Sequence, residues 1–307
     1  MAPEQHGASA GLSVEVFEVE AEAPGLRCCA FLRSPAGLPA ANLAYFQSGT
    51  GIYTTAHGDL DGLGRSAARS GRFAVLSVDK PGITVASDGR VVVDRGVFAL
   101  HTMADLVACG RRALDVALAR PGIDGQASVL VHGHSEGAQV WARILDVSAA
   151  RGAADALLDR VRLSVLSGLP MEPVVSGAER QLGVFMPFEI EAFRRALLAR
   201  DDDYLLLLGM PWRYFEHPTA REGMAAVLSR VAEKRPGLRL DLFHGERDRN
   251  APIAPVRALV EAQRLARAER RPALDARLRA YPGATHQLDA RLDTDLDALV
   301  ASLPARR

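Results

Sequence analysis

The chain has 307 residues, 48% of them hydrophobic, so it is long enough to bury a sizeable core. Lysine and arginine together number 37, and so do aspartate and glutamate, which gives a formal net charge of zero at pH 7. This balance provides no long-range field to attract nucleic acid or an anionic membrane surface. The expected partner is therefore a small-molecule substrate.

Residues 1–11 contain neither the basic segment nor the apolar stretch of a secretion signal, and we expect a disordered tail there. The longest apolar run, Tyr204 to Met210, is far shorter than the roughly 20 residues that span a bilayer. Three cysteines, of which Cys28 and Cys29 are adjacent, cannot build a disulfide framework, so reduced thiols are expected. These features predict a soluble, cytoplasmic protein with no membrane association.

The first elements along the chain are two strands. Leu12 to Val19 alternates apolar and charged residues, and Leu26 to Leu32 follows after Ala-Pro-Gly, which predicts an antiparallel hairpin at a sheet edge. Six short, nearly continuous apolar runs then predict strands that are covered on both faces. They are Asn42–Phe46, Phe73–Val78, Ser128–His132, Leu163–Leu166, Leu238–Phe243 and Ala276–Tyr281.

Segments with helical periodicity lie between these strands. In the clearest, Thr102 to Ala119, residues Leu106, Cys109 and Ala113 fall on one face, and Pro121-Gly122 follows its end. Further helices are predicted over Glu136–Val147, Pro255–Ala268 and Leu292–Leu303. Alternation of strand and helix predicts an α/β fold with a mostly parallel sheet.

One connection is too long for a single helix. About 70 residues separate the Leu163 strand from the Leu238 strand, whereas α/β connections usually need far fewer. We therefore expect a core of residues 12–168 and 237–307 with a helical cap inserted at 169–236. Helices are predicted within the cap over Pro187–Ala199 and Thr219–Glu233, and Asp201 to Asp203 could begin another.

Gly133-His134-Ser135-Glu136-Gly137 fits the Gly-x-Ser-x-Gly pattern of a nucleophile elbow. The pattern requires a strand, a sharp turn and a helix, and here an apolar strand precedes it and a helical segment follows it. The glycines remove side chains that would clash where strand and helix approach closely, and the serine hydroxyl is left exposed at a helix N-terminus. Ser135 is therefore the candidate nucleophile.

A serine hydroxyl needs a base to take its proton and a carboxylate to orient that base. The Leu238 strand leads into His244-Gly245-Glu246-Arg247-Asp248, and the Ala276 strand leads into Pro282-Gly283-Ala284-Thr285-His286. Both segments end candidate strands at the sheet edge that carries Ser135. Asp248 and His286 are thus the predicted acid and base, in the order serine, aspartate, histidine.

These three signatures in this order resemble the α/β-hydrolase family, and the resemblance extends from about Leu12 to the C-terminus. It implies an eight-stranded sheet, hydrolysis through an acyl-enzyme, and no metal or organic cofactor. An oxyanion hole would use the backbone N–H of Glu136 and a second N–H from the turn after the Asn42 strand. Thr50 is the expected second donor. Ser48 and Gly49 stay open as alternatives, because this chain has Ser-Gly where relatives usually have His-Gly.

Other residues compete for these roles. His132 and His134 flank Gly133, but they have no nearby carboxylate or cysteine with ligand spacing, so packing at the elbow is expected in place of a metal site. His244 is an alternative base, and Glu172, which follows the Leu163 strand, is an alternative acid. The turn at 79–82 is expected to be structural. The glycine-rich stretches at 49–51 and 58–64 match neither a phosphate loop nor a dinucleotide fingerprint.

Most aromatic residues of the cap fall in two segments, 182–188 and 210–215. An insertion over the catalytic edge is where such residues would bind an acyl or alcohol group, although packing of cap on core is the alternative. The substrate-binding candidates are Phe185, Phe188, Trp212 and Tyr214.

The expected function is a serine hydrolase that cleaves an ester or thioester of a small, fairly apolar substrate. An aminopeptidase or amidase on the same fold is the nearest alternative, and a lyase or cyclase that uses the same triad is another. A noncatalytic binding protein that keeps the fold also stays open.

Overall fold

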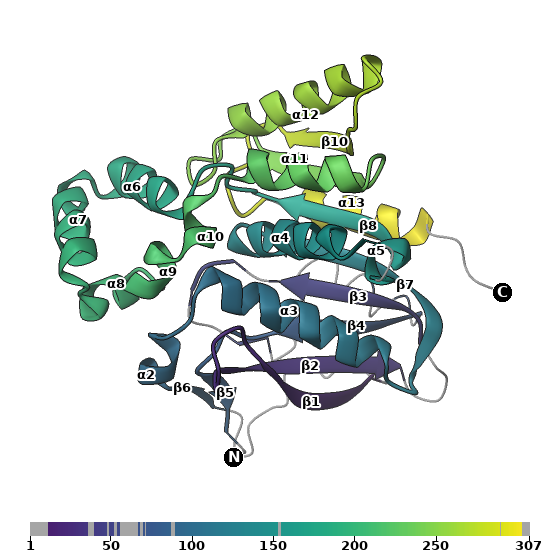
Figure 1. Ribbon diagram of the computed structural model, residues 1–307, viewed down its shortest axis with the longest axis horizontal. Coiled ribbons are helices and arrows are strands. Elements are labelled where there is room, and N and C mark those ends of the chain that lie inside the picture. Colours follow the sequence, from purple (N-terminus) through teal and green to yellow (C-terminus); the bar gives the residue numbers. More distant parts are fainter. Residues whose placement is uncertain are drawn as a thin grey trace.

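The computed structural model describes residues 12–35, 40–47, 49–51, 54–55, 67, 70, 72–86, 90–152, 155–288 and 290–302. Its central feature is an eight-stranded sheet in the order β1-β2-β4-β3-β7-β8-β9-β10 (Figure 1). β2 pairs antiparallel with both β1 and β4, and every other neighbouring pair is parallel. The predicted fold class, a mostly parallel sheet with flanking helices, is confirmed. The predicted disordered tail, residues 1–11, lies outside the described residues.

The bounds of the sheet strands are β1 Leu12–Glu20, β2 Arg27–Pro35, β3 Ala40–Gln47, β4 Phe73–Val78, β7 Ile123–His134, β8 Val161–Ser167, β9 Arg239–Gly245 and β10 Asp275–Tyr281. A separate two-stranded sheet, β5 (Ile83–Val85) and β6 (Val91–Val93), follows β4 and was not predicted. The core helices are α2 Arg95–Phe98, α3 Met103–Leu118, α4 Glu136–Ala150, α5 Leu157–Arg160, α11 Met224–Lys234, α12 Ile253–Ala268 and α13 Ala290–Ser302.

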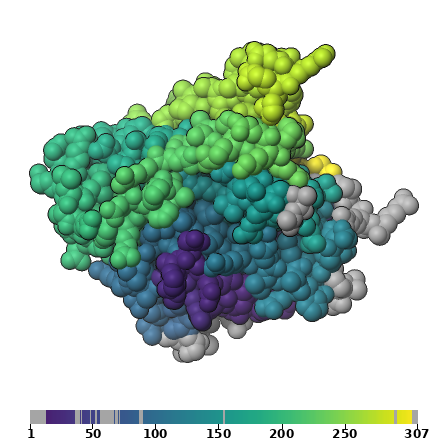
Figure 2. Space-filling view, in the orientation of Figure 1, coloured from purple at the N-terminus to yellow at the C-terminus, as the bar shows by residue number. Residues whose placement is uncertain are grey.

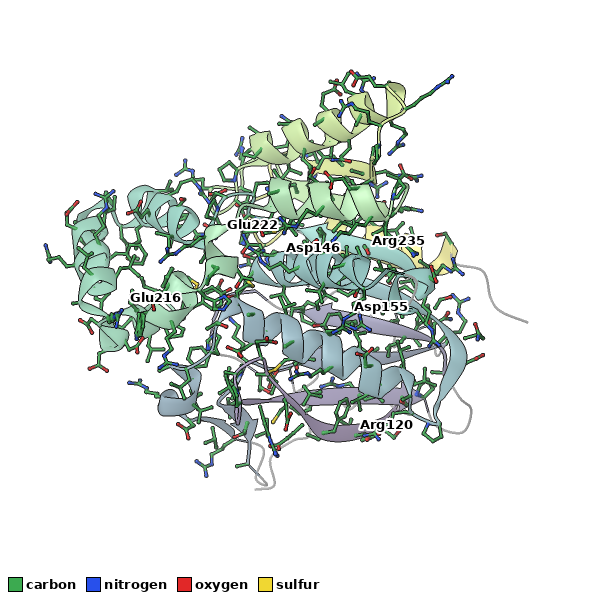
Figure 3. The ribbon with its side chains drawn as sticks, viewed as in Figure 1. Arg120, Asp146, Asp155, Glu216, Glu222 and Arg235 are labelled. Carbon is green, nitrogen blue, oxygen red and sulfur yellow. A yellow bond between two sulfur atoms is a disulfide. The ribbon has the colours of Figure 1, made fainter. Side chains whose placement is uncertain are left out.

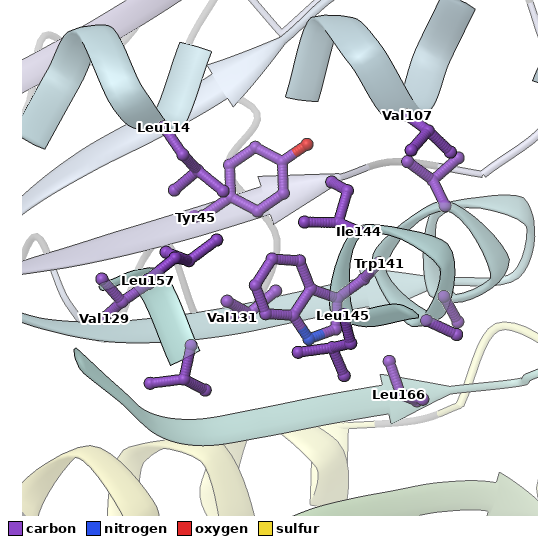
Figure 4. Packing of buried hydrophobic residues seen from close by; sticks show 14 of the residues in the cluster. Tyr45, Val107, Leu114, Val129, Val131, Trp141, Ile144, Leu145, Leu157 and Leu166 are labelled. Atoms are coloured by element: carbon purple, nitrogen blue, oxygen red, sulfur yellow. The ribbon is translucent and has the colours of Figure 1, made fainter. Parts of the chain in front are cut away.

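Helices cover both faces of the sheet, which explains the nearly continuous apolar strands. On β3, Leu43 and Tyr45 join the cluster under α3 and α4, whereas Ala44 between them joins a second cluster with α13. Tyr45 lies across from Trp141 of α4, with ring centroids 6.0 Å apart (Figure 4). Full burial of strands on both faces is typical of parallel sheets.

The cap lies beyond the carboxyl ends of the parallel strands (Figure 1). It consists of α6 (Val174–Phe185), the 3₁₀ turn η2 (Pro187–Glu189), α7 (Ile190–Ala199), α8 (Asp202–Leu207), α9 (Trp212–Glu216) and α10 (Pro218–Arg221). These helices have a small apolar cluster of their own, which includes Leu182, Phe193 and Phe215. In the space-filling view they form a lobe at one side of the molecule, continuous with α11 (Figure 2).

The chain enters and leaves the cap at one place. Met224 N–H donates to the Met171 carbonyl over 2.9 Å, so the two connections lie side by side. Asp146 of α4 and Glu222 also meet there (Figure 3), and Arg230 of α11 forms ion pairs with both carboxylates. We call this junction the neck.

The last part of the predicted cap differs from expectation. The sequence predicted one helix over Thr219–Glu233, but the chain turns at Gly223 and forms α10 and α11. The apolar face of α11, with Val227 and Val231, belongs to the main core cluster and packs on α4. Helix α11 therefore covers the sheet and is not part of the cap lobe.

The expectation of reduced thiols was wrong. A disulfide joins Cys28 of β2 to Cys109 of α3 across 81 positions, and only Cys29 is a free thiol. Cys28 is buried on the face of the sheet that α3 covers, and Cys109 lies on the inward face of that helix. Because disulfides persist mainly in oxidising compartments, a cytoplasmic location loses one of its arguments and stays a prediction. None of the helices among the described residues is long and apolar enough to cross a membrane.

Candidate active site

Ser135 lies at the turn between β7 and α4, in a conformation that non-glycine residues rarely adopt, with φ 54° and ψ −118°. Its backbone N–H donates to the Ser167 carbonyl at the end of β8 over 2.9 Å. A Cβ placed on Gly133 would lie 2.5 Å from the Gly137 carbonyl oxygen, so only glycine fits where strand and helix meet. The elbow thus holds the hydroxyl at the N-terminus of α4, where the helix dipole favours negative charge.

Backbone donors suited to an oxyanion lie beside this hydroxyl. Glu136 is the first residue of α4, and an N–H at that position has no partner inside its helix. Thr50 lines the same small cavity as Ser135 and Glu136, and a Cβ on Gly49 would lie 3.1 Å from Ser135 Cβ. Ser48, the other predicted alternative, lies outside the described residues. The segment 49–51 therefore borders the nucleophile.

Asp248 and His286 meet at the ends of β9 and β10. Asp248 Oδ2 accepts a hydrogen bond from His286 Nδ1 over 2.8 Å, and its Oδ1 accepts from the N–H groups of Asn250 and Ala251, each also over 2.8 Å. Both side chains are buried. The backbone N–H groups hold the carboxylate in place, and the carboxylate leaves His286 with a free Nε2 to act as a base.

The imidazole of His286 lies beside the elbow. Its ring centroid is 4.9 Å from that of His134, the residue before Ser135, although no hydrogen bond joins Ser135 Oγ to His286 among the described residues. Gly168, at the end of β8, has φ +54°, and a Cβ there would lie 3.1 Å from His286 Nδ1. The imidazole therefore fits against a glycine, and serine–histidine contacts are often long before substrate binds.

His132 and His134 share a hydroxyl partner. His132 Nε2 and His134 Nδ1 lie 2.7 and 3.0 Å from Ser167 Oγ. Burial lowers the pKa of His132 to about 3, and burial together with the charge of His286 lowers the pKa of His134 to about 4. Both rings are thus neutral near pH 7. No group of three or more metal-ligating side chains is arranged to hold an ion in the described parts of the chain.

The two alternative residues have other partners. His244 Nε2 donates to the Ala251 carbonyl over 2.5 Å and lies 3.4 Å from Asp248 Oδ2. Glu172 lines the cavity at Ser135 but forms an ion pair with Arg180 of α6. The structure therefore brings Asp248, and not Glu172, to the imidazole of His286.

A buried ion pair under the elbow was not predicted. Lys80 Nζ lies 2.6 Å from Glu136 Oε2, and both side chains are less than 5% exposed. His101 and Tyr214 are fully buried nearby, with ring centroids 5.6 Å apart. Burial and the charge of Glu136 both raise the pKa of the Tyr214 hydroxyl. Lys80 thus anchors the side chain of Glu136, the residue that follows Ser135.

Asp79, in the turn expected to be structural, fixes the segment that follows Thr50. Its carboxylate accepts from Thr55 N–H over 2.7 Å and from Thr55 Oγ1 over 2.8 Å. Arg33 donates to the Thr55 carbonyl from the other side over 2.5 Å. No spacing in the sequence pointed to this network, because its members come from three distant segments.

The four predicted substrate-binding aromatics occupy different places. Tyr214 lines the cavity at Ser135, whereas Trp212 lines a separate cavity inside the cap. Phe185 lines a cleft at His286, and Phe188 is 77% exposed on the outer surface of the cap. Of the four, Tyr214 and Phe185 therefore border the candidate catalytic residues.

No protein-family model matches the sequence, and no curated protein is similar to it. Solved structures are similar in fold. The esterase Est1E from Butyrivibrio proteoclasticus is 14% identical, with a TM-score of 0.55 over 95% of this chain and 98% of that one. A lipase in an open form is 16% identical, with a TM-score of 0.60 over 94% of this chain and 97% of the other. Esterase Est22 is 16% identical, with a TM-score of 0.56 over 95% of this chain and 80% of its own.

At these identities the likeness establishes the fold and leaves the chemistry to be argued from the site. The eight-stranded sheet, the strand-to-helix elbow and the helical insertion after β8 agree with that likeness. The chain therefore has the α/β-hydrolase fold.

Proposed function

We propose that the protein is a serine hydrolase that cleaves an ester or thioester of a small, fairly apolar substrate through an acyl-enzyme. The observation that carries the proposal is the Asp248–His286 hydrogen bond of 2.8 Å beside a strained serine elbow. A carboxylate, an imidazole and an activated hydroxyl are the groups that acyl transfer requires.

The steps follow from this arrangement. His286 Nε2 takes the proton of Ser135 as Oγ bonds to the substrate carbonyl carbon, and the N–H groups of Glu136 and Thr50 stabilise the resulting oxyanion. The C–O or C–S bond then breaks, and the imidazolium gives its proton to the leaving alcohol or thiol. Water, deprotonated by the same imidazole, attacks the acyl-enzyme and releases the acid and Ser135.

The cavity at Ser135 favours short acyl groups. Its volume is about 40 Å³, which holds roughly three water-sized groups. Met210 and Tyr214 of the cap and several residues of α6 line it. Acetyl and butyryl esters should therefore be cleaved faster than octanoyl esters.

Glu172 is the acidic side chain at this cavity that could recognise the amino group of a peptide. Its ion pair with Arg180 already neutralises its charge, so nothing here favours an aminopeptidase over an esterase.

A fluorophosphonate probe tests the proposal directly, followed by p-nitrophenyl esters, acyl thioesters and aminoacyl amides. We expect covalent labelling and ester turnover in the wild type and neither in Ser135→Ala, with a loss on the order of 10⁴ to 10⁶ in rate. Wild-type turnover by a folded Ser135→Ala variant would exclude this mechanism. A folded wild type that neither reacts with the probe nor hydrolyses any substrate would support the noncatalytic binder.

A further inference from the structure

Two spaces of very different size flank the catalytic residues. The cavity that Ser135, Glu136 and Thr50 line has a volume of about 40 Å³. A cleft that Asp248 and His286 line has a volume of about 750 Å³. Helix α6 of the cap joins their walls, because Gln181 Nε2 donates to the Asn250 carbonyl over 3.0 Å.

The chemistry of acyl transfer assigns the two spaces. The carbonyl oxygen must face the N–H groups beside Ser135, so the acyl group occupies the small cavity. The leaving group must receive its proton from His286, so it departs on the side of the imidazole. The larger cleft is therefore the place for the alcohol or thiol portion of the substrate.

The charges along this cleft are unevenly balanced. The carboxylate of Glu246 is paired with Arg257 over 2.6 Å, and that of Asp248 is occupied by His286 and two backbone N–H groups. Arg247 and Arg249 also line the cleft, and neither guanidinium forms an ion pair or side-chain hydrogen bond with another described residue. The cleft therefore presents two positive charges whose partners are not supplied by the described parts of the chain.

An apolar ring accompanies these charges. Phe185, at the end of α6, is 54% exposed although it lines the cleft. Burying such a ring against a ligand is favourable, and an arginine beside it can bind a carboxylate or phosphate through two parallel hydrogen bonds. A molecule that carries both an apolar body and an anionic group would match the cleft.

We propose that the leaving group is an alcohol or thiol that is larger than the acyl group and carries a carboxylate or phosphate, bound by Arg247 and Arg249. This inference rests on the proposed function. In the overall reaction, water adds its hydroxyl to the short acyl group and its proton to the oxygen or sulfur of the anionic leaving group.

Acetate esters of one phenol series test the preference, since they differ in charge and little in shape. They are 4-acetoxybenzoate, its neutral analogue 4-acetoxybenzamide, and 4-acetoxyphenyl phosphate. The wild type should show kcat/KM about three- to tenfold higher for an anionic ester than for the amide, the size expected of exposed ion pairs. High salt should reduce this ratio. The larger ratio of the two anions identifies carboxylate or phosphate as the preferred group.

The double variant Arg247→Gln/Arg249→Gln should bring the ratio close to one. Arg264→Gln on α12 removes one positive charge from a pair with Glu261 outside the cleft, and it should keep the wild-type ratio. Both kcat/KM values of a ratio are measured on the same protein preparation. The fraction of folded protein therefore divides out of the ratio.

A binding measurement separates this inference from the proposed function. The product 4-hydroxybenzoate should bind Ser135→Ala more tightly than 4-hydroxybenzamide, and the two arginine substitutions should abolish the difference. A wild-type ratio at or below one, or a ratio that the double variant retains, would overturn the inference. If no ester is turned over, the proposed function fails, and equal binding of the two products would then reject the inference as well.

Discussion

Gly168 illustrates how one residue determines where the base can lie. Its φ of +54° is in the left-handed region, and a Cβ there would lie 3.0 Å from His286 Cε1 and 3.1 Å from His286 Nδ1. A side chain at this position would push the imidazole away from the elbow. The proposed mechanism depends on this placement, because small displacements of reacting groups reduce rates greatly.

Gly168→Ala should therefore lower kcat by about 10²-fold while the protein stays folded. Gly152→Ala is the matched control, because Gly152 has a similar φ of +62° and open space around its Cβ position. Both variants place a side chain at a similar positive φ, so the comparison isolates the contact with His286. Equal activity of the two variants would show that the contact with His286 is unimportant.

The acid can be tested with isosteric amides. Asp248→Asn should lower kcat by up to about 10⁴, because the carboxylate orients the imidazole and stabilises its charged form. Glu172→Gln should be nearly silent, since Glu172 is paired with Arg180 and not with His286. Steady-state kinetics on variants with matched thermal unfolding measures both effects. An impaired Glu172→Gln variant beside a nearly unaffected Asp248→Asn variant would identify Glu172 as the acid.

The sequence predicted the position of some residues at the site well and that of others not at all. Ser135, Asp248 and His286 follow strands within short motifs, so local patterns were enough to predict that they lie at one edge of the sheet. Lys80 and Tyr214 meet Glu136 only because a turn, a cap helix and the elbow converge, and no local pattern records that convergence. Phe188 was predicted to bind substrate because it is an aromatic residue of the cap, but residue type does not tell which way a side chain points. In the structure it is exposed.

At the scale of elements, the disulfide connects the antiparallel edge of the sheet to its covering helix. It closes a loop over 81 positions between β2 and α3, and such a cross-link restricts the unfolded chain. The sequence could not reveal it, because the pairing depends on which face of β2 meets α3. Cys29, the neighbour of Cys28, points to the other face and remains free.

The double variant Cys28→Ala/Cys109→Ala should lower the free energy of unfolding by about 2 to 5 kcal/mol. Cys29→Ala removes the free thiol and serves as the control, with a much smaller effect expected. Urea denaturation of each protein measures the difference. If reduction of the wild type left its unfolding midpoint unchanged, the cross-link would contribute nothing to stability.

Elements with strong periodicity were predicted closely, as for α3 and α12, because one apolar face packs on the sheet. The cap was harder. Its helices are short and its cluster small, so the amphipathic signal of α6 was missed and the break at Gly223 was not recognised. Short helices depend on tertiary packing more than on their own sequence.

Across the whole molecule, burial of neutral histidines makes stability depend on pH. Burial lowers the pKa of His101 to about 4 and that of His132 to about 3, and burial with the charge of His286 lowers that of His134 to about 4. In the unfolded chain these rings bind protons below about pH 6.5. Between that pH and about 4 the unfolded state therefore holds more protons, and stability is lost as pH falls.

We expect the free energy of unfolding to drop between about pH 6.5 and pH 4.5 by up to about 1.4 kcal/mol per pH unit for each buried histidine. Urea denaturation across this range measures the slope. His101→Asn should reduce the slope, because it removes one of the buried rings. An identical slope in His101→Asn and the wild type would contradict this origin.

The neck brings the two ends of the cap insertion together, which matters for exchanging the cap. Because Met224 N–H bonds to the Met171 carbonyl, the two ends of the insertion lie together, like the ends of a surface loop. Most of the cap has its own apolar cluster, whereas Tyr214 of α9 packs in the main core cluster. A foreign cap would therefore need ends that lie equally close together and an apolar residue in the place of Tyr214. Under the proposed function, exchange of this one module would change the substrate range while Ser135, Asp248 and His286 stay in place.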